Sequence, residues 1–217
     1  MPATQNICFY YLGFSGGKFL ANCLALSRHV VCNHAYLAKE DLEWEPLDEY
    51  YYQYKLHSVM TSLSPTFISD GVWKEFPGLD IPETHNRGCG NIVELARQKQ
   101  RIVCHMAHTV EDLQKFKDKF PDLKIVKLLN FKKFNSLCYS LKSKQPEELG
   151  RHEQGFDSWI SQSVSSDIDV DMDALIYDPE QFLPEIKKLY DYFGLDDFRP
   201  DLLTPFYDKY KSLHHLP

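Results

Sequence analysis

Three glycines and a lysine stand between an apolar stretch and a helical pattern near the start of the chain. Gly13, Gly16 and Gly17 precede Lys18. Glycines accept positive φ angles and let backbone N–H groups approach an anion closely, and the start of a helix carries a partial positive charge. Lys18 adds a full positive charge at the same place. This combination predicts an anion site of the phosphate-binding-loop kind, and the alternative is a tight turn that holds no ligand.

The segments on either side of this loop have the patterns that such a site requires. Residues 7–12 form a short, almost continuous apolar run, which is typical of a central parallel strand covered on both faces. We therefore expect the loop to join a buried strand to a packed helix. The apolar residues that recur at helical spacing after the loop are Phe19, Leu20, Cys23, Leu24 and Leu26.

The loop departs from the nucleotide-triphosphatase motif G-x-x-x-x-G-K-[ST] at two positions. Leu12 stands at the first glycine, and Phe19 replaces the hydroxyl residue that ligates magnesium. The segment S-G-G-K-F-L, residues 15–20, instead resembles the S-G-T-T-W-L core of the 5′-phosphosulfate loop in the sulfotransferase family. The resemblance implies a donor site that needs no metal, with Lys18 also taking part in catalysis. The residues that it implies for donor binding are Ser15, Gly16, Gly17, Lys18 and Phe19.

The last third of the chain resembles the closing segment of the same family. There a short strand ending in Tyr-Glu/Asp leads into a helix that finishes in Phe-Leu-Gly-Leu, and residues 174–195 of this chain follow that order. Residues 175–177 are a strand-sized apolar run, and Asp178-Pro179 is a helix-start signal. Gly194 is suited to end the helix as a C-cap. We expect a strand near 174–177 and a packed helix after it.

A third segment, residues 124–141, also has the pattern of a strand followed by a helix. In sulfotransferases the matching strand ends in R-N-P-x-D, and its arginine and a helix serine hold the 3′-phosphate of the donor. Here Asn130 stands at the place of the arginine and Cys138 at that of the serine. Lysines near the helix start can supply charge, although not the bidentate fork of arginine. The residues expected to bind the 3′-phosphate are Lys132, Lys133, Ser136 and Ser140; the alternative is that these lysines are solvated.

Residues 101–108 form a strand pattern that ends in histidines. Ligands bind off the carboxyl ends of strands in open α/β sheets, so we expect His105 and His108 to face the glycine loop. Residues 104–107 (C-H-M-A) resemble the T-H-L-P segment of sulfotransferases, which implies that His105 is the catalytic base. A histidine accepts a proton readily near neutral pH. His108 is expected to hydrogen-bond a loop or to be exposed, and H-x-x-H without further partners falls below the usual ligand count of a metal site.

Composition excludes some classes of protein. The chain has 217 residues, of which 43% are hydrophobic, so one domain with a substantial core is expected. The net charge of −7 disfavours a nucleic-acid binder. Six cysteines without a C-x-x-C pair are typical of reduced thiols in a cytoplasmic protein. Because the first residues lead directly into the first strand, we expect no signal peptide and no membrane anchor.

These observations predict a single three-layer α/β sandwich over residues 1–217, with a mainly parallel sheet of the P-loop or sulfotransferase-like kind. An irregular insertion is expected near 64–91, and residues 161–173 are expected to be a solvated connector. Strands are expected near 7–12, 102–106, 124–130 and 174–177, and less clearly near 29–32 and 66–69.

The resemblance implies transfer of a sulfuryl group from the co-substrate 3′-phosphoadenosine 5′-phosphosulfate to a hydroxyl or amine of a small-molecule or glycan acceptor. Two alternatives stay open. One is a nucleotide-dependent kinase on the same loop. The other is a non-catalytic descendant of the fold that binds a nucleotide or nothing, which the missing arginine and Phe14, at the family's loop-lysine position, favour.

Overall fold

The structure is a computed structural model that describes residues 6–12, 16–32, 38–62, 89–130, 159, 162–213 and 216. Within these residues five strands form one sheet in the order β2-β3-β1-β4-β5, and each neighbouring pair is parallel. The predicted α/β class with a parallel sheet is therefore confirmed. The strands are β1 (Asn6–Tyr10), β2 (Val30–Cys32), β3 (Ile102–Ala107), β4 (Lys124–Leu129) and β5 (Ile168–Asp171).

The first strand lies at the centre of the sheet. All five residues of β1 are buried, which explains its unbroken apolar pattern. Cys8 of β1 pairs in register with His105 of β3 and with Ile125 of β4. Side chains at paired positions of parallel strands point to the same face, so the register determines which side chains share each side of the sheet.

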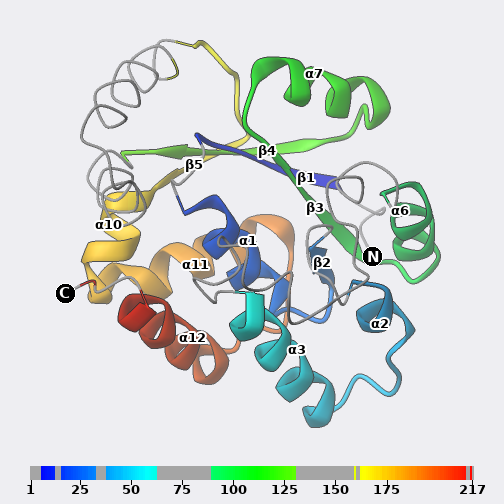
Figure 1. The fold of residues 1–217 in the computed structure, drawn as a ribbon, viewed down its shortest axis with the longest axis vertical. Coiled ribbons are helices and arrows are strands. Elements are labelled where there is room, and N and C mark those ends of the chain that lie inside the picture. Colours follow the sequence, from blue (N-terminus) through cyan, green and yellow to red (C-terminus); the bar gives the residue numbers. More distant parts are fainter. Residues whose placement is uncertain are drawn as a thin grey trace, which may run out of the picture.

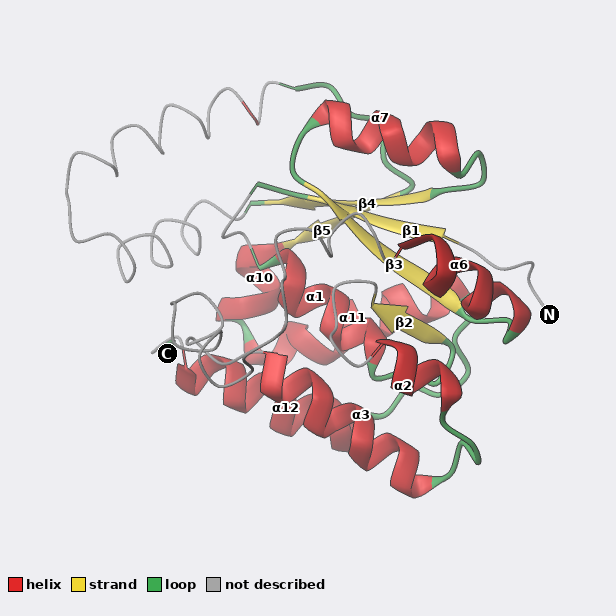
Figure 2. Ribbon diagram, turned by 45° about the vertical axis from the view of Figure 1, so that its right-hand side comes forward, coloured by secondary structure: helices red, strands yellow, loops and turns green. Residues whose placement is uncertain are grey.

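Helices cover both faces of the sheet, which makes the expected three layers (Figures 1 and 2). One face is covered by α7 (Val110–Lys119). Two short helices, α2 (Ala38–Glu43) and α6 (Cys89–Gln98), lie near β2 and β3. The helices on the side opposite α7 are α1 (Gly17–Ala25), α3 (Glu49–Ser62), α10 (Met172–Tyr177), α11 (Pro179–Phe193) and α12 (Pro200–Leu213). Among the described residues, none of the helices is long and apolar enough to cross a membrane.

Aromatic packing holds α1 against the C-terminal helices. The ring of Phe19 is 1% exposed and stacks on Phe206 and Tyr210 of α12, with ring centroids 5.4 and 4.0 Å apart. The Tyr190 hydroxyl of α11 donates a hydrogen bond to the Cys23 carbonyl of α1, at 3.0 Å. The predicted apolar face of α1 is thus the face that packs on α11 and α12.

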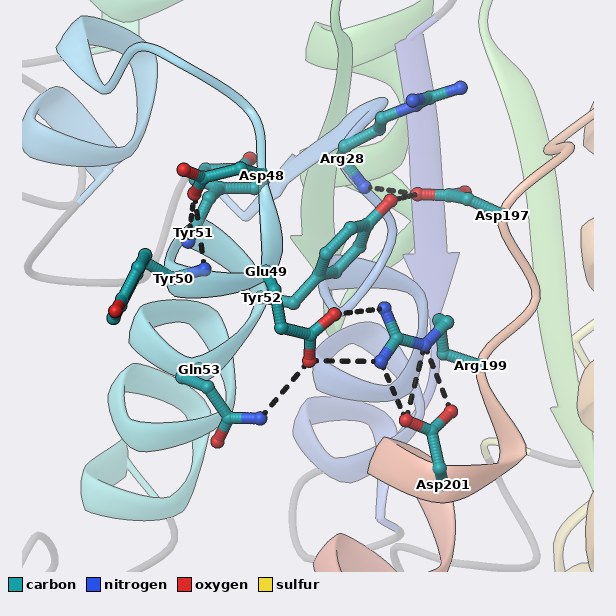
Figure 3. Close-up of polar contacts among 10 residues, drawn as sticks. All are labelled: Arg28, Asp48, Glu49, Tyr50, Tyr51, Tyr52, Gln53, Asp197, Arg199 and Asp201. Atoms are coloured by element: carbon teal, nitrogen blue, oxygen red, sulfur yellow. Dashed lines mark hydrogen bonds and ion pairs between the residues drawn. The ribbon is translucent and has the colours of Figure 1, made fainter.

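A polar cluster ties α3 to the turn between α11 and α12 (Figure 3). Arg199 donates to both carboxylate oxygens of Glu49 at the start of α3, at 3.1 Å each, and also to Asp201. Its guanidinium lies 4.7 Å from the centroid of the Tyr52 ring. Asp197, in the same turn, accepts a hydrogen bond from the Tyr52 hydroxyl. These contacts hold the turn at the side of the molecule where α3 and α12 begin.

Two expectations for the end of the chain were wrong. Residues 174–177, predicted as a strand, belong to α10, and the strand is β5 within the stretch predicted as a connector. β5 alternates Ile168 and Val170 with aspartates, which is the pattern of a short edge strand with one buried face. Asp171 then caps α10 by accepting from the Ala174 N–H at 2.9 Å, and this cap starts the helix.

Another predicted strand is confirmed, and one lies outside the described residues. Residues 30–32 form β2, as expected near 29–32. The strand expected at 66–69 and residues 64–88 of the expected insertion lie outside the described residues, and the last residues of that insertion, from Cys89 onwards, belong to α6.

Candidate functional site

The start of α1 follows the carboxyl end of β1 and is described from Gly16 onwards. Gly16 adopts a left-handed conformation, with φ 80° and ψ 6°, and caps α1 without a side-chain hydrogen bond. Its carbonyl accepts the Leu20 N–H at 3.0 Å, so α1 begins at Gly17 and Lys18 is its second residue. The first N–H groups of a helix have no partner within the helix and point out of its end. Gly16, Gly17 and Lys18 thus stand at the helix start, and their part in anion binding stays a prediction; Ser15 lies outside the described residues.

Gly17 also leaves room for the ring of Tyr11, which the sequence did not predict. The ring of Tyr11 lies so close that a β-carbon on residue 17 would be 2.2 Å from Tyr11 Cε1. The Tyr11 hydroxyl donates to Met106 Sδ at 2.7 Å. Burial raises the pKa of the Tyr11 phenol, so this group stays protonated at neutral pH and cannot act as a base.

The side chain of Phe19 belongs to the core and not to the helix start. Its side chain is buried in the aromatic packing with α12. The apolar residue at the position of the magnesium-binding hydroxyl is therefore explained by core packing. Any contact of Phe19 with a donor is made by its N–H group at the helix start.

His105 does not lie where the sequence predicted. It is 1% exposed on the face covered by α7, between the rings of Phe116 and Phe120 at 4.9 and 5.0 Å, and its Nε2 lies 3.1 Å from Asn6 Oδ1. The cause is the register: His105 pairs with Cys8, and both point away from α1. Burial lowers the pKa of His105 to about 4, and the charge of Lys119 adds to this effect. The ring is neutral at physiological pH and packed inside the protein.

His108 hydrogen-bonds the segment after β1 and is exposed, as the sequence predicted. It follows β3 directly, is exposed, and places Nδ1 3.1 Å from the Tyr11 carbonyl oxygen. A carbonyl only accepts, so Nδ1 carries the proton, and in the neutral ring Nε2 has the lone pair. The Tyr11 ring packs edge-on against His108, at 4.6 Å between centroids, and also contacts Gly17. The sequence could have indicated His108 as the candidate base by its position, because it is the histidine beyond the last residue of the strand.

Asn130 directly follows β4 at the same edge of the sheet. Its φ angle of 49° is left-handed, which asparagine tolerates better than most residues. Its side-chain amide donates to Asp171 Oδ2 at 2.7 Å, and its carbonyl accepts from the Asp173 N–H at 3.1 Å. A carboxylate therefore lies beside the position where the family has an arginine. The residues predicted to replace that arginine lie outside the described residues; they are Lys132, Lys133, Ser136 and Ser140.

The described residues define an α/β protein in which a helix that starts after a left-handed glycine follows the central strand of a parallel sheet. No protein-family profile and no curated protein matches the sequence. Among solved structures, the chain is similar to a sulfotransferase domain from the curacin biosynthetic pathway, with 16% identity and a TM-score of 0.47 over 94% of this chain and 78% of that one.

It is also similar to a sulfotransferase from Mycobacterium tuberculosis H37Rv, with 15% identity and a TM-score of 0.42 over 100% of this chain and 74% of that one. Identities and TM-scores of this size are too low to transfer an activity or a substrate.

Proposed function

We propose that this protein transfers a sulfuryl group from 3′-phosphoadenosine 5′-phosphosulfate to a hydroxyl or amine of a small-molecule or glycan acceptor. The observation that carries the proposal is the start of α1. Left-handed Gly16 and half-buried Lys18 stand at the carboxyl end of the central parallel strand, where open α/β sheets bind their ligands. The N–H groups of that helix start, together with the lysine, suit a phosphosulfate.

Each residue of the site has a part in the proposed reaction. Ser15, Gly16, Gly17 and the backbone of Phe19 bind the 5′-phosphosulfate, and Lys18 neutralises the charge that builds on the leaving phosphate. Lys132, Lys133, Ser136 and Ser140 bind the 3′-phosphate. His108 Nε2 takes the proton as the acceptor oxygen or nitrogen attacks sulfur. The bond between sulfur and the bridging oxygen breaks, and adenosine 3′,5′-bisphosphate leaves. Charge stabilisation comes from this chain's own cations, and we expect no metal in the transfer.

A non-catalytic nucleotide-binding protein of the same fold is the second candidate. Two observations favour it: His105 is buried away from the loop, and Asn130 is held by the carboxylate of Asp171. A kinase gains no such support, because the side chain at the magnesium position, Phe19, is buried in the core.

A thermal-shift experiment with three ligands tests the proposal. A ligand that binds only the native state raises the melting temperature. We expect adenosine 3′,5′-bisphosphate to raise it more than ATP, and magnesium to add nothing to the effect of ATP. Sulfuryl transfer from labelled donor to a panel of phenols, amines and sugars then separates the enzyme from the non-catalytic protein. A shift with ATP alone that depends on magnesium would favour the kinase, and a protein that responds to none of the three ligands would contradict the proposal.

We also propose that the protein is cytoplasmic. Four cysteines in the described part of the chain, Cys8, Cys23, Cys32 and Cys104, are buried and free, as is usual where thiols stay reduced. Labelling of thiols in unfolded protein taken directly from cells tests this, since a cytoplasmic protein should show all six cysteines of the sequence as free thiols.

A further inference from the structure

Three potential metal ligands converge at the amino edge of the sheet, away from the proposed donor site. His29 lies in the turn between α1 and β2, and Asp196 and Asp197 lie in the turn between α11 and α12. One ligand atom from each residue lies within 4.8 Å of the other two. The nine residues of α1 separate this cluster from Gly16 by about 13 Å, at 1.5 Å per residue.

The hydrogen bonds at His29 Nε2 are in conflict. This atom lies 2.7 Å from Asp196 Oδ1 and 3.3 Å from Arg28 Nε. The arginine nitrogen can only donate, so it needs the lone pair of Nε2, whereas the carboxylate can only accept and needs a proton on Nε2. One ring nitrogen cannot meet both demands. A cation placed between Nε2 and the carboxylates uses the lone pairs of both and removes the conflict.

Three hydrogen bonds fix the orientation of the Asp197 carboxylate. This carboxylate accepts from Ser27 Oγ at 2.6 Å. It also accepts from the Arg28 N–H at 2.7 Å and from the Tyr52 hydroxyl at 2.9 Å (Figure 3). A carboxylate has about four lone-pair sites, so one remains. Hydrogen bonds of this kind fix the orientation of metal-binding carboxylates in proteins.

We propose that His29, Asp196 and Asp197 bind one divalent transition-metal ion of the zinc class, with water completing the coordination. An imidazole nitrogen with two carboxylate oxygens suits zinc, cobalt or nickel, whereas magnesium and calcium prefer oxygen ligands alone. The ion joins the α1–β2 turn to the α11–α12 turn. Its role is structural, and it is independent of the proposed transfer reaction.

Arg28 competes with the metal ion for this place. Its Nη2 lies 3.3 Å from Asp196 Oδ1, and its side chain is 38% exposed, so it can swing into solvent. Its guanidinium contacts only the two proposed ligands His29 and Asp196 among the described residues, whereas its backbone N–H holds Asp197. Removing the guanidinium therefore leaves the frame of the site in place and takes away a positive charge that repels a metal ion.

Isothermal titration of the metal-free full chain with Zn²⁺ tests the proposal. We expect saturable binding of one ion, weakened at least tenfold by His29→Gln and by Asp196→Asn, and tightened severalfold by Arg28→Gln. Asp197 is left unchanged because its loss would also disturb Ser27 and Tyr52. His57→Gln, at an exposed histidine on α3, is the matched control and should bind Zn²⁺ like the wild type.

Melting temperature gives a second readout. Zn²⁺ should raise it in the wild type and raise it further in Arg28→Gln, chelation should reverse both shifts, and His29→Gln should show neither. The proposal is overturned if neither the wild type nor Arg28→Gln binds Zn²⁺ saturably. It is equally overturned if His57→Gln weakens binding as much as His29→Gln, since binding would then be spread over surface histidines.

Discussion

The aromatic ring of Tyr11 occupies the space that a side chain on Gly17 would need, with Tyr11 Cε1 2.2 Å from the position of a β-carbon. Gly17→Ala must therefore displace the ring and with it the hydrogen bond from the Tyr11 hydroxyl to Met106. We expect the free energy of unfolding to fall by about 1–3 kcal/mol, the usual cost of overpacking. Urea denaturation measures this loss.

Gly194→Ala is the control for the Gly17 prediction. Gly194 has a φ of 67° and no atom within 4 Å of a β-carbon, so alanine there costs only the left-handed conformation, roughly 1–2 kcal/mol. Combining each change with Tyr11→Leu separates the two causes. The double-mutant cycle should show coupling between residues 11 and 17 and none between 11 and 194. Equal coupling for both pairs would contradict a steric role for Tyr11.

Lys18→Ala should weaken binding of adenosine 3′,5′-bisphosphate. A charge-assisted hydrogen bond contributes about 1.5–3 kcal/mol, so we expect a dissociation constant roughly 10–150 times higher. Titration calorimetry measures this change. Lys187→Ala removes an exposed lysine that pairs with Asp191 on α11 and should change affinity little. If both variants bind as the wild type does, the helix start is not the donor site.

Substitutions of His105 in β3 and of His108 directly after it should have different effects, one on stability and the other on activity. His108→Asn removes the exposed Nε2 lone pair and should lower the transfer rate roughly 10²–10⁴-fold, as for loss of a general base, with little change in unfolding free energy. His105→Gln should lower the unfolding free energy and leave the transfer rate nearly unchanged, because that ring is buried against Phe116 and Phe120. Steady-state kinetics measures the transfer rates of both variants, and urea denaturation measures their unfolding free energies. A rate loss confined to His105→Gln would restore the role that the sequence suggested.

His105 should also make the protein sensitive to acid. Its pKa is about 4 in the folded state and near 6.5 when unfolded, so between these values the unfolded chain binds more protons. The stabilisation is complete above pH 6.5 and is lost as the pH falls towards 4, by about 3 kcal/mol in all. His105→Gln should flatten this part of the profile. Denaturation of both proteins at pH 7, 5.5 and 4.5 gives the difference, and parallel profiles would show that His105 does not titrate in this way.

Local patterns were enough to predict the central strands and the start of α1. The apolar run at residues 7–12 and the glycines before Lys18 need no knowledge of distant residues, and β1 and α1 lie where these patterns placed them. β5 was missed because an edge strand buries one face only. Its alternating aspartates are hard to distinguish in sequence from a solvated connector.

The face to which a histidine points depends on how its strand pairs with its neighbour. This pairing cannot be read from the sequence of one segment. Whether His105 points towards α1 or α7 is decided by its pairing with Cys8, about a hundred positions away in the chain. A shift of one residue would have turned His105 to the other face. His29, Asp196 and Asp197 were missed for a similar reason, since the two turns that carry them meet only in the folded chain.

In the proposed function, the lysines after Asn130 distinguish a donor with a 3′-phosphate from one without it. Asn130 is held by Asp171, and a carboxylate there repels a phosphate, so other cations must supply the attraction. Lys132 and Lys133 follow directly in the sequence. Lys132→Ala combined with Lys133→Ala should weaken adenosine 3′,5′-bisphosphate far more than adenosine 5′-phosphate, because only the former loses a partner. Calorimetry with both nucleotides measures the two losses. Equal losses would mean that the lysines act through their general field alone, and the donor would then be a nucleotide without a 3′-phosphate.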